Sequence, residues 1–419
     1  MRRNILICSR IKLFVLIYLL SQLNFISAQN FEIKSLRIYS SADQIEFPVI
    51  DYSEKSIAGI TIEFDVQSKF IPNLNILFRF CDANWIPYEN AFLINPMYNT
   101  ENNLWFDRLP STVRDARFHY KGSFPNNNVN FPFSGNWMFF IVDSQNRNKA
   151  YASGRFYVVN PEVKLTTQLL AEGSEGNIPE QNALRRTFSI RTNFSIPDTL
   201  FPANVSHVEI IQNRKFYYPI VIDRNTFTPD RFYEWNASDN FSFVARNIKP
   251  GNENRQTDIR DAGTYSSSTV SSKFGEIETS NFYNKGKQDL NGSSYLMDFR
   301  NEDAVYLNVV FKIRPPENIK SPIFLAGSFN NWIVSPKYEM FDDNGMMNLS
   351  LQLKRGIYDY QYVTGEVAGD HIENINWEIL EGNFWETRNE YFIFLYYKTI
   401  EKGGYDKIIG YKKIMSNSL

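Results

Sequence analysis

The stretch Ile60-Thr61-Ile62-Glu63-Phe64-Asp65-Val66 decides the fold class, because apolar and polar side chains alternate along it without a break. Alternation with a period of two predicts a β-strand with one buried face and one solvent-exposed face. The same pattern recurs at 74–81, 188–191, 208–210, 241–243, 305–309 and 349–353. The chain therefore reads as a series of strands, and no long amphipathic helix interrupts it.

The composition is that of a chain with a large apolar core. Hydrophobic residues make up 43% of the sequence, and the 35 Phe, 24 Tyr and 7 Trp raise the aromatic share to 16%. The net charge of −2 gives no polybasic footprint for nucleic acid. Three His and two Cys, Cys8 and Cys81, are too few for a His/Cys-rich zinc site or a disulfide framework.

Turn-forming clusters of Asn, Pro, Gly and Ser separate the strands, which favours tandem β-sandwiches. Breaks near 160–162 and 298–303 predict three immunoglobulin-like or early-set domains at 29–160, 161–304 and 305–419. Two polar stretches, 251–258 and 266–272, read as long exposed loops. The fold class expected is thus all-β throughout.

Residues 1–28 have the pattern of a cleaved signal peptide: basic residues, an apolar run at 13–20, and Ala28 before the cut. The alternative is an N-terminal membrane anchor, but the run is too short to cross about 30 Å of hydrocarbon. No Cys follows the cut, so no lipid anchor is expected, and no later stretch is long and apolar enough for a transmembrane helix. The sequence predicts an exported protein.

The turn Phe329-Asn330-Asn331-Trp332 follows an apolar strand and is the most specific local motif. It resembles the corresponding turn in the early-set domains of the glycogen-binding module family. That resemblance implies that Trp332 stacks on a sugar, but Gln361 stands where the family has a sugar-binding Lys. In the structural interpretation, which we favour, Trp332 packs against the sandwich edge and Asn330 and Asn331 form the turn.

A second resemblance extends over most of the chain. Eight segments, taken in order, are similar to segments of the plug-protein family of the type IX secretion system, with Trp137 in place of a family Tyr. These plug-like segments are FRFCDANW (78–85), FSGNWM (133–138), IQNR (211–214), SNFY (280–283), DLNG (289–292), GSFNNW (327–332), KRGIYDYQY (354–362) and EY (390–391). The resemblance implies a periplasmic protein that closes the inner mouth of a very large outer-membrane translocon barrel.

No residue pattern points to catalysis. His119 and His207 read as strand positions and His371 as a loop residue, while Cys81 reads as an inert, buried or half-buried thiol. Two carboxylate pairs remain, Asp342 with Asp343 and Asp258 with Asp261. The first lies in an Asp-Asn-Gly turn, and a functional pairing of carboxylates is spatial and cannot be read from spacing. We expect no enzyme, no cofactor and no bound metal.

Three hypotheses follow, in order of preference. The first is a plug or accessory protein that binds the type IX translocon barrel and binds no nucleic acid. The second is an exported carbohydrate-binding protein that uses Trp332. The third is a glycan-processing enzyme whose carboxylates the sequence does not reveal.

Overall fold

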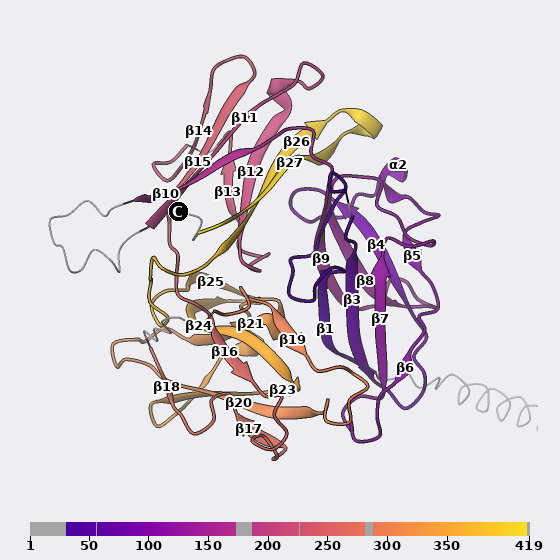
Figure 1. The fold of residues 1–419 in the computed structure, drawn as a ribbon, viewed down its shortest axis with the longest axis vertical. Coiled ribbons are helices and arrows are strands. Elements are labelled where there is room, and N and C mark those ends of the chain that lie inside the picture. Colours follow the sequence, from indigo (N-terminus) through magenta and orange to yellow (C-terminus); the bar gives the residue numbers. More distant parts are fainter. Residues whose placement is uncertain (1–30, 56, 173–186, 226, 281–287, 417–419) are drawn as a thin grey trace, which may run out of the picture.

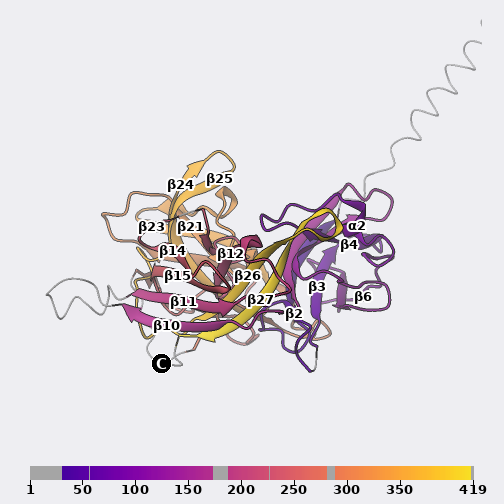
Figure 2. The same cartoon turned by 90° about the horizontal axis from the view of Figure 1, so that it is seen from above.

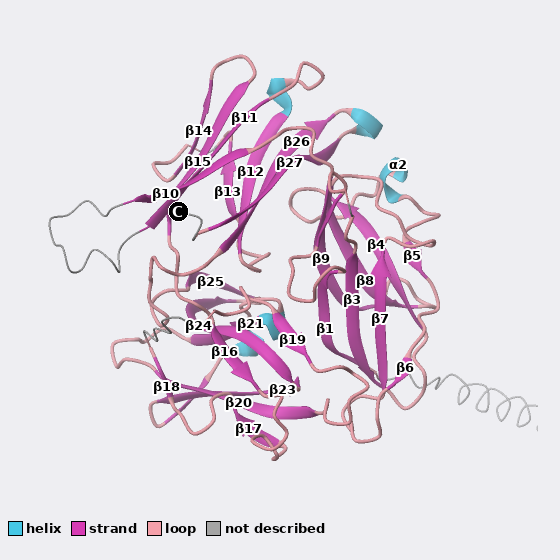
Figure 3. Ribbon diagram, in the orientation of Figure 1, coloured by secondary structure: helices cyan, strands magenta, loops and turns pink. Residues whose placement is uncertain are grey.

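The computed structural model describes residues 31–55, 57–172, 187–225, 227–280 and 288–416. Strands dominate these residues, and the helices among them are the single turn α2 (Ala91–Ile94) and short 3₁₀ turns (Figure 3). The prediction of an all-β chain is confirmed. The predicted signal peptide at 1–28 lies outside the described residues. The strands form three lobes arranged around a common centre (Figure 1).

Domain 1 covers residues 31–160 and consists of two packed sheets. The first has the order β1 (Glu32–Ser40), β3 (Ile60–Gln67), β7 (Phe118–Phe124), β6 (Asp107–Arg108). The second has the order β2 (Val49–Asp51), β9 (Ala150–Val159), β8 (Gly135–Asp143), β4 (Leu74–Cys81), β5 (Thr100–Glu101). The apolar faces predicted for β3 and β4 meet in the core, where Phe78 packs edge-on against Phe124, Phe131 and Phe156.

Domain 2 is built from two stretches of chain, 161–250 and 389–416. One sheet has the order β10 (Thr166–Glu172), β11 (Thr187–Ser195), β15 (Asn240–Ile248), β14 (Arg231–Trp235). The facing sheet has the order β13 (Ile220–Asp223), β12 (Val205–Gln212), β26 (Glu390–Thr399), β27 (Tyr405–Met415). In Figure 1 the late strands β26 and β27 accordingly lie beside the much earlier strands β12 and β13.

Domain 3 is the intervening stretch, 251–388, and also consists of two sheets. β24 (Gly356–Ala368) lies at the centre of one sheet, and β20 (Tyr306–Arg314) and β23 (Met346–Lys354) are paired in the other. The partners of β24 are β16 (Arg255–Asp258), β19 (Ser294–Leu296), β21 (Ile323–Gly327) and β25 (His371–Asn376). The other sheet also contains β17 (Thr269–Ser271), β18 (Glu278–Thr279) and β22 (Phe341–Asp343).

The strand pairing departs from the predicted division at 304/305. The C-terminal hairpin β26–β27 completes domain 2, so domain 3 is inserted within domain 2 rather than following it. The stretch 251–258 is not an exposed loop, because it contains β16 of domain 3, in which Arg255 is 1% exposed and bonds to the buried Glu278 and Glu381. The stretch 266–272 contains β17, but its residues 266–269 are exposed, as the sequence predicted.

The chain passes between domains 2 and 3 twice, at 250–251 and at 388–389. These two crossings lie side by side and are joined through Asn389. Its side-chain amide donates to the Pro250 carbonyl at 2.8 Å, and its side-chain oxygen accepts from Asn213 at 2.9 Å. Asn213 in turn accepts the backbone N–H of Glu390 at 2.9 Å. The plug-like segments 211–214 and 390–391 therefore meet at this crossing.

Phe78 gives a direct test of the domain 1 core. Phe78→Ala should lower the free energy of unfolding of domain 1 by about 3–5 kcal/mol, because it leaves a cavity among rings that cannot close in. Phe341→Ala, at a side chain 72% exposed, is the control and should change it by less than about 0.5 kcal/mol. Denaturant unfolding followed by fluorescence measures both, and equal effects would contradict this packing.

Candidate functional site at the domain junctions

The alternation in the sequence predicted that the polar face of β3 is exposed to solvent. In the structure domain 3 covers this face. Asp65 is 1% exposed, and its carboxylate contacts three side chains. Lys354 Nζ and the Tyr306 hydroxyl, both from domain 3, donate to Asp65 Oδ2 at 2.8 Å. His119 Nδ1 lies 2.7 Å from Asp65 Oδ1. A buried cluster of charges thus joins domain 1 to domain 3.

The electrostatics keep the Asp65 carboxylate ionised. Burial alone would raise the pKa of Asp65, but the His119 hydrogen bond and the Lys354 charge outweigh it and hold that pKa below its usual range. His119 lies in β7, as predicted, and its ring stacks on Phe299 of domain 3 at 3.8 Å between centroids. Asp65 and His119 are each 1% exposed, so the pair joins the domains and is closed to a substrate.

The junction of domains 1 and 2 is built by the plug-like segment 133–138. Ser134 Oγ donates to the Ile408 carbonyl at 2.5 Å, and the Tyr396 hydroxyl donates to Asn136 Oδ1 at 2.6 Å. A Cβ at Gly135 would lie 2.7 Å from the Phe80 ring and 3.0 Å from the Asp406 carbonyl oxygen. Only glycine lets the two backbones approach this closely.

Rings fill the rest of this junction. Phe47 stacks on Phe392 at 3.9 Å and Tyr157 stacks on Phe394 at 4.1 Å, each pair joining domain 1 to domain 2. Such pairs contribute about 0.5–1.5 kcal/mol beyond the area that they bury. Part of the aromatic excess noted in the sequence therefore lies between domains rather than within them.

The plug-like segment 78–85 ends at the same junction. The backbone N–H of Ala83 donates to Asp406 Oδ2 at 3.0 Å, which ties the turn after β4 to β27. Cys81 is buried, and burial raises the pKa of its thiol to about 12. A thiol with so high a pKa is a poor nucleophile near neutral pH, in line with the inert role expected from the sequence.

The turn Phe329-Asn330-Asn331-Trp332 is an internal support and not an exposed platform. Trp332 is 2% exposed, and its Nε1 donates to the Gly292 carbonyl at 2.7 Å. Asn330 accepts the backbone N–H of Gly327 and donates to the Leu325 carbonyl, while Asn331 has a left-handed φ of 53°. The partly buried Phe329 packs on Phe311 at 5.5 Å. A sugar cannot stack on a buried Trp332, so the structure does not support that role.

Domain 2 covers this turn. The backbone N–H of Val334 donates to the Tyr218 hydroxyl at 2.9 Å, and Lys215 Nζ lies 4.0 Å from the centre of the Trp377 ring. Burial lowers the pKa of Lys215 to about 8. Tyr218 and Lys215 belong to domain 2 and their partners to domain 3, so the third junction combines a hydrogen bond with a cation–π contact.

The plug-like segment 354–362 links these features. It begins with Lys354, the partner of Asp65, and Arg355 donates to three backbone carbonyls of 259–265. Asp359 Oδ2 accepts the backbone N–H groups of Leu290 and Gly292 at 2.8 and 3.0 Å. Gly292 is the residue whose carbonyl receives Trp332, so segments 289–292, 327–332 and 354–362 form one connected unit.

The remaining candidates from the sequence have local roles. His371 starts β25 on the surface beside Glu373, Asp342 accepts the Gly345 N–H in its turn, and Asp258 pairs with Arg260. Asp261 accepts from Gly263 and Thr264. Across the part of the chain that the structure describes, no group of three or more His, Cys, Asp and Glu side chains could hold a metal ion. No described helix is long and apolar enough to cross a membrane.

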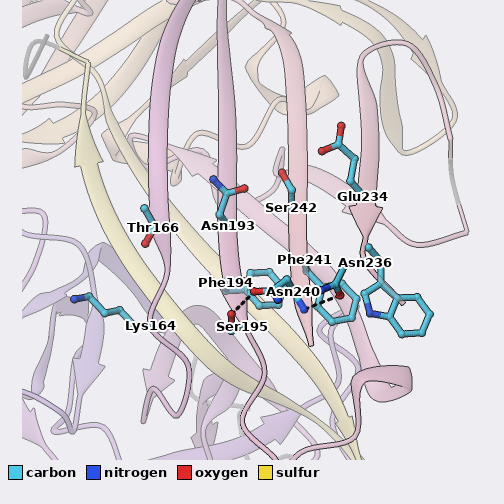
Figure 4. A pocket seen from close by; sticks show the side chains of 11 residues that line it. Lys164, Thr166, Asn193, Phe194, Ser195, Glu234, Asn236, Asn240, Phe241 and Ser242 are labelled. Atoms are coloured by element: carbon cyan, nitrogen blue, oxygen red, sulfur yellow. Dashed lines mark hydrogen bonds between the residues drawn. The ribbon is translucent and has the colours of Figure 1, made fainter. Parts of the chain in front are cut away.

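A shallow groove of about 720 Å³ runs over the outer sheet of domain 2 (Figure 4). Its floor is a polar row across four strands in register: Thr166, Asn193, Ser242 and Glu234. Several of its polar groups already bond within the sheet, as Glu234 and Ser242 do with Arg191. Trp235 at its edge stacks on Phe241 with an angle of 4° between the rings. The hydrogen-bonding capacity of these polar groups is therefore used within the sheet, and they do not by themselves indicate a ligand site.

The fold and its junctions define a class: an all-β protein of three sandwiches held together by buried contacts. Residues 33–160 match the family model of the type 9 secretion system plug protein 1st domain. The resemblance seen in the sequence is thereby confirmed over domain 1, and it links the chain to type IX secretion in the bacterial envelope.

One solved structure has a similar fold over most of the chain, and a second has little structural similarity. A crystal structure of a hypothetical protein from Parabacteroides merdae is 18% identical, with a TM-score of 0.71, and covers 92% of this chain and 97% of its own. It shows that the arrangement of all three domains exists elsewhere. A structure from a study of a bacterial ice-binding adhesin is 9% identical over 92% of this chain and 97% of its own, with a TM-score of 0.15. No curated protein matches.

Asp65 tests the junction of domains 1 and 3. Asp65→Asn leaves Lys354 buried without its counter-charge and should lower the free energy of unfolding by about 3–5 kcal/mol at pH 7. Asp198→Asn at an exposed position is the control. The double variant Asp65→Asn/Lys354→Met should recover part of the loss, since neither charge is then buried alone. A single variant as stable as the control would contradict the junction.

The same group predicts a pH dependence. Because the folded pKa of Asp65 lies below its unfolded value, its contribution is fully present above about pH 3.9 and is lost as the pH falls toward the folded value. Wild-type protein should therefore lose stability in this acid window more steeply than Asp65→Asn. Thermal unfolding between pH 6 and pH 3 measures the difference in slope.

Trp332 separates a structural role from sugar binding. Trp332→Ala should lower the free energy of unfolding by about 3–5 kcal/mol, whereas Trp105→Ala, at a side chain 84% exposed, should be nearly neutral. Neither the wild-type protein nor either variant should be retained on a glucan column. Retention of the wild type that a folded Trp332→Ala variant loses would restore the sugar-binding hypothesis.

Proposed function

We propose that this protein is a periplasmic, non-enzymatic plug of the type IX secretion system. It occludes the periplasmic mouth of the outer-membrane translocon barrel through protein–protein contacts. The match of residues 33–160 to the plug protein 1st domain is the observation that carries this proposal.

The junctions supply a physical reason why the fold suits such a role. A protein that blocks a wide pore has to keep its shape. Domains joined only by flexible linkers would move relative to one another and leave gaps. Here Asp65 and Lys354, the Phe47–Phe392 stack and the contacts around Trp332 join the three domains pairwise. Opening any of them would expose buried charge or ring surface, which is costly.

Domain 1 also offers surface for a partner. Several large apolar side chains on its loops and on α2 are more than half exposed: Phe70, Ile71, Ile86, Phe92, Met97 and Trp105. Large exposed apolar side chains, aromatic ones above all, are enriched at protein interfaces. The domain that matches the plug family thus exposes the kind of side chain that a docking surface uses.

An affinity pull-down from the native cell tests the proposal. Wild-type protein with a C-terminal tag should recover the translocon barrel from detergent-solubilised envelopes. Phe92→Ser and Trp105→Ser combined should reduce this recovery at least tenfold, because they remove exposed aromatic anchors.

The matched control is Phe341→Ser in domain 3, at a side chain 72% exposed. It should recover the barrel as the wild type does. If the wild-type protein recovers no outer-membrane barrel, the plug function is refuted. If the domain 1 double variant recovers as much barrel as the wild type, docking through these loops of domain 1 is refuted.

A further inference from the structure

A cavity of about 420 Å³ lies at the rim of the junction between domains 1 and 2. Domain 1 contributes the turn after β4 and one side chain of β9, and domain 2 contributes β12, β13, β26, β27 and the turn before β13. Pockets of this size accept small ligands or the end of a larger one. The cavity shares no residue with the groove in Figure 4.

Arg155 dominates the domain 1 side of the cavity. Its guanidinium lies between two rings, 4.6 Å from the centre of Trp85 and 4.1 Å from the centre of Tyr217. Trp85 belongs to domain 1 and Tyr217 to domain 2, so the bracket forms only when the domains are joined. A guanidinium that packs on ring faces can still donate hydrogen bonds, because its N–H groups lie in its own plane.

The donors of Arg155 are under-used. Its Nε is buried and has no hydrogen-bond partner among the described residues. None of the ion pairs within the described part of the chain includes Arg155. No hydrogen bond joins its two terminal nitrogens to another described residue, so these donors remain available to an acceptor in the cavity.

The three carboxyl groups of the cavity already accept hydrogen bonds from within the protein. Asp406 accepts the backbone N–H of Ala83, and Asp223 accepts the backbone N–H of Asn225 at 2.6 Å. Glu209 is 2% exposed and accepts the Tyr157 hydroxyl at 2.8 Å, and burial raises its pKa to about 7. Burial lowers the pKa of His207 to about 4, so that ring is neutral near pH 7. The other charged group that lines the cavity, besides Arg155, is Lys398.

We propose that this cavity binds a carboxylate group, which Arg155 holds through the two donors on the edge of its guanidinium. Arginine is suited to this because its planar fork matches a carboxylate with two parallel hydrogen bonds. The carboxylate belongs either to a small free acid or to the C-terminal end of a peptide. This site goes beyond the proposed plug function and does not depend on it.

The alternative role for Arg155 is purely structural: through its contacts with Trp85 and Tyr217 it would act as a clamp between domains 1 and 2. The two roles predict different measurements. A clamp affects stability alone, whereas a carboxylate site gives saturable binding that depends on the guanidinium and on the ligand's charge. Arg155→Lys keeps a cation in the bracket and removes the fork, so it separates the two roles.

Isothermal titration of the folded chain at pH 8 tests the site with three probes: succinate, triglycine and triglycine amide. We expect saturable binding of succinate, of triglycine, or of both, and none of the amide. Arg155→Lys should weaken binding at least tenfold. Arg147→Lys, on an exposed turn of the same domain, is the matched control and should bind as the wild type does. Glu209→Gln should tighten binding several-fold, because it removes a competing negative charge.

Binding of succinate alone would identify a small acid as the ligand, and binding of triglycine alone would identify a peptide end. The proposal is overturned if no carboxylate probe binds at millimolar concentration. It is overturned equally if the amide binds as well as the acid, or if Arg155→Lys binds the carboxylate probes like the wild type. A lower melting temperature of that variant would then assign Arg155 the role of a clamp between the domains. These outcomes do not depend on recovery of the barrel, so the two proposals fail separately.

Discussion

The contact of Asp65 with Lys354 is the constraint on which the arrangement of the domains depends. Both side chains are almost fully buried, and among the described residues Lys354 forms no ion pair other than the one with Asp65. Separating domains 1 and 3 would leave each charge either unpaired in an apolar setting or newly exposed. Tyr306 and His119 satisfy the remaining oxygen positions of Asp65, so the cluster is complete only when the two domains are together.

The other two junctions also hold their domains together, but through contacts of a different kind. Domains 1 and 2 meet through stacked rings and through the close approach of the Gly135 and Asp406 backbones. Domains 2 and 3 share two chain crossings joined by Asn389, and domain 2 covers the turn that holds Trp332. Six plug-like segments contribute to these junctions or to the crossing: 78–85, 133–138, 211–214, 327–332, 354–362 and 390–391. Segment 289–292 contacts Trp332 and Asp359 within domain 3. The resemblance to the plug family therefore falls mostly on residues that hold the domains in place.

The sequence predicts the strands well and their long-range pairing poorly. Alternation at 60–66 and 74–81 identified the buried faces of β3 and β4, since that signal is local. The same alternation placed Asp65 on a wet face, because nothing near it in sequence reveals that Lys354 will cover it. Pairing of β26 with β12 joins residues that are nearly 200 positions apart, and no local pattern reveals a contact over that separation. The polar run at 298–303 therefore favours a domain boundary in the sequence, although the strand pairing places none there.

At the candidate site, too, the sequence predicts the local backbone conformation but not the surroundings of the side chains. Asn330 and Asn331 form the turn that their residue types predict, and the burial of Trp332 depends on Gly292, 40 positions earlier. The Arg155 bracket had no local signal at all, because Trp85 and Tyr217 come from different domains. A motif reports the conformation of its own backbone, and the environment of its side chains follows only from the assembled fold.

Distances between spin labels on the three domains test the central claim, that the domains form one rigid body, most directly. Labels on Arg147→Cys, Asp198→Cys and Asp343→Cys, taken in pairs, would report on domains 1, 2 and 3 from exposed positions. Cys81 is buried, and removal of the predicted leader removes Cys8. A rigid unit predicts one narrow distance distribution for each pair, broadened between domains 1 and 3 by Asp65→Asn. Broad or multiple distributions in the wild-type protein would contradict the account.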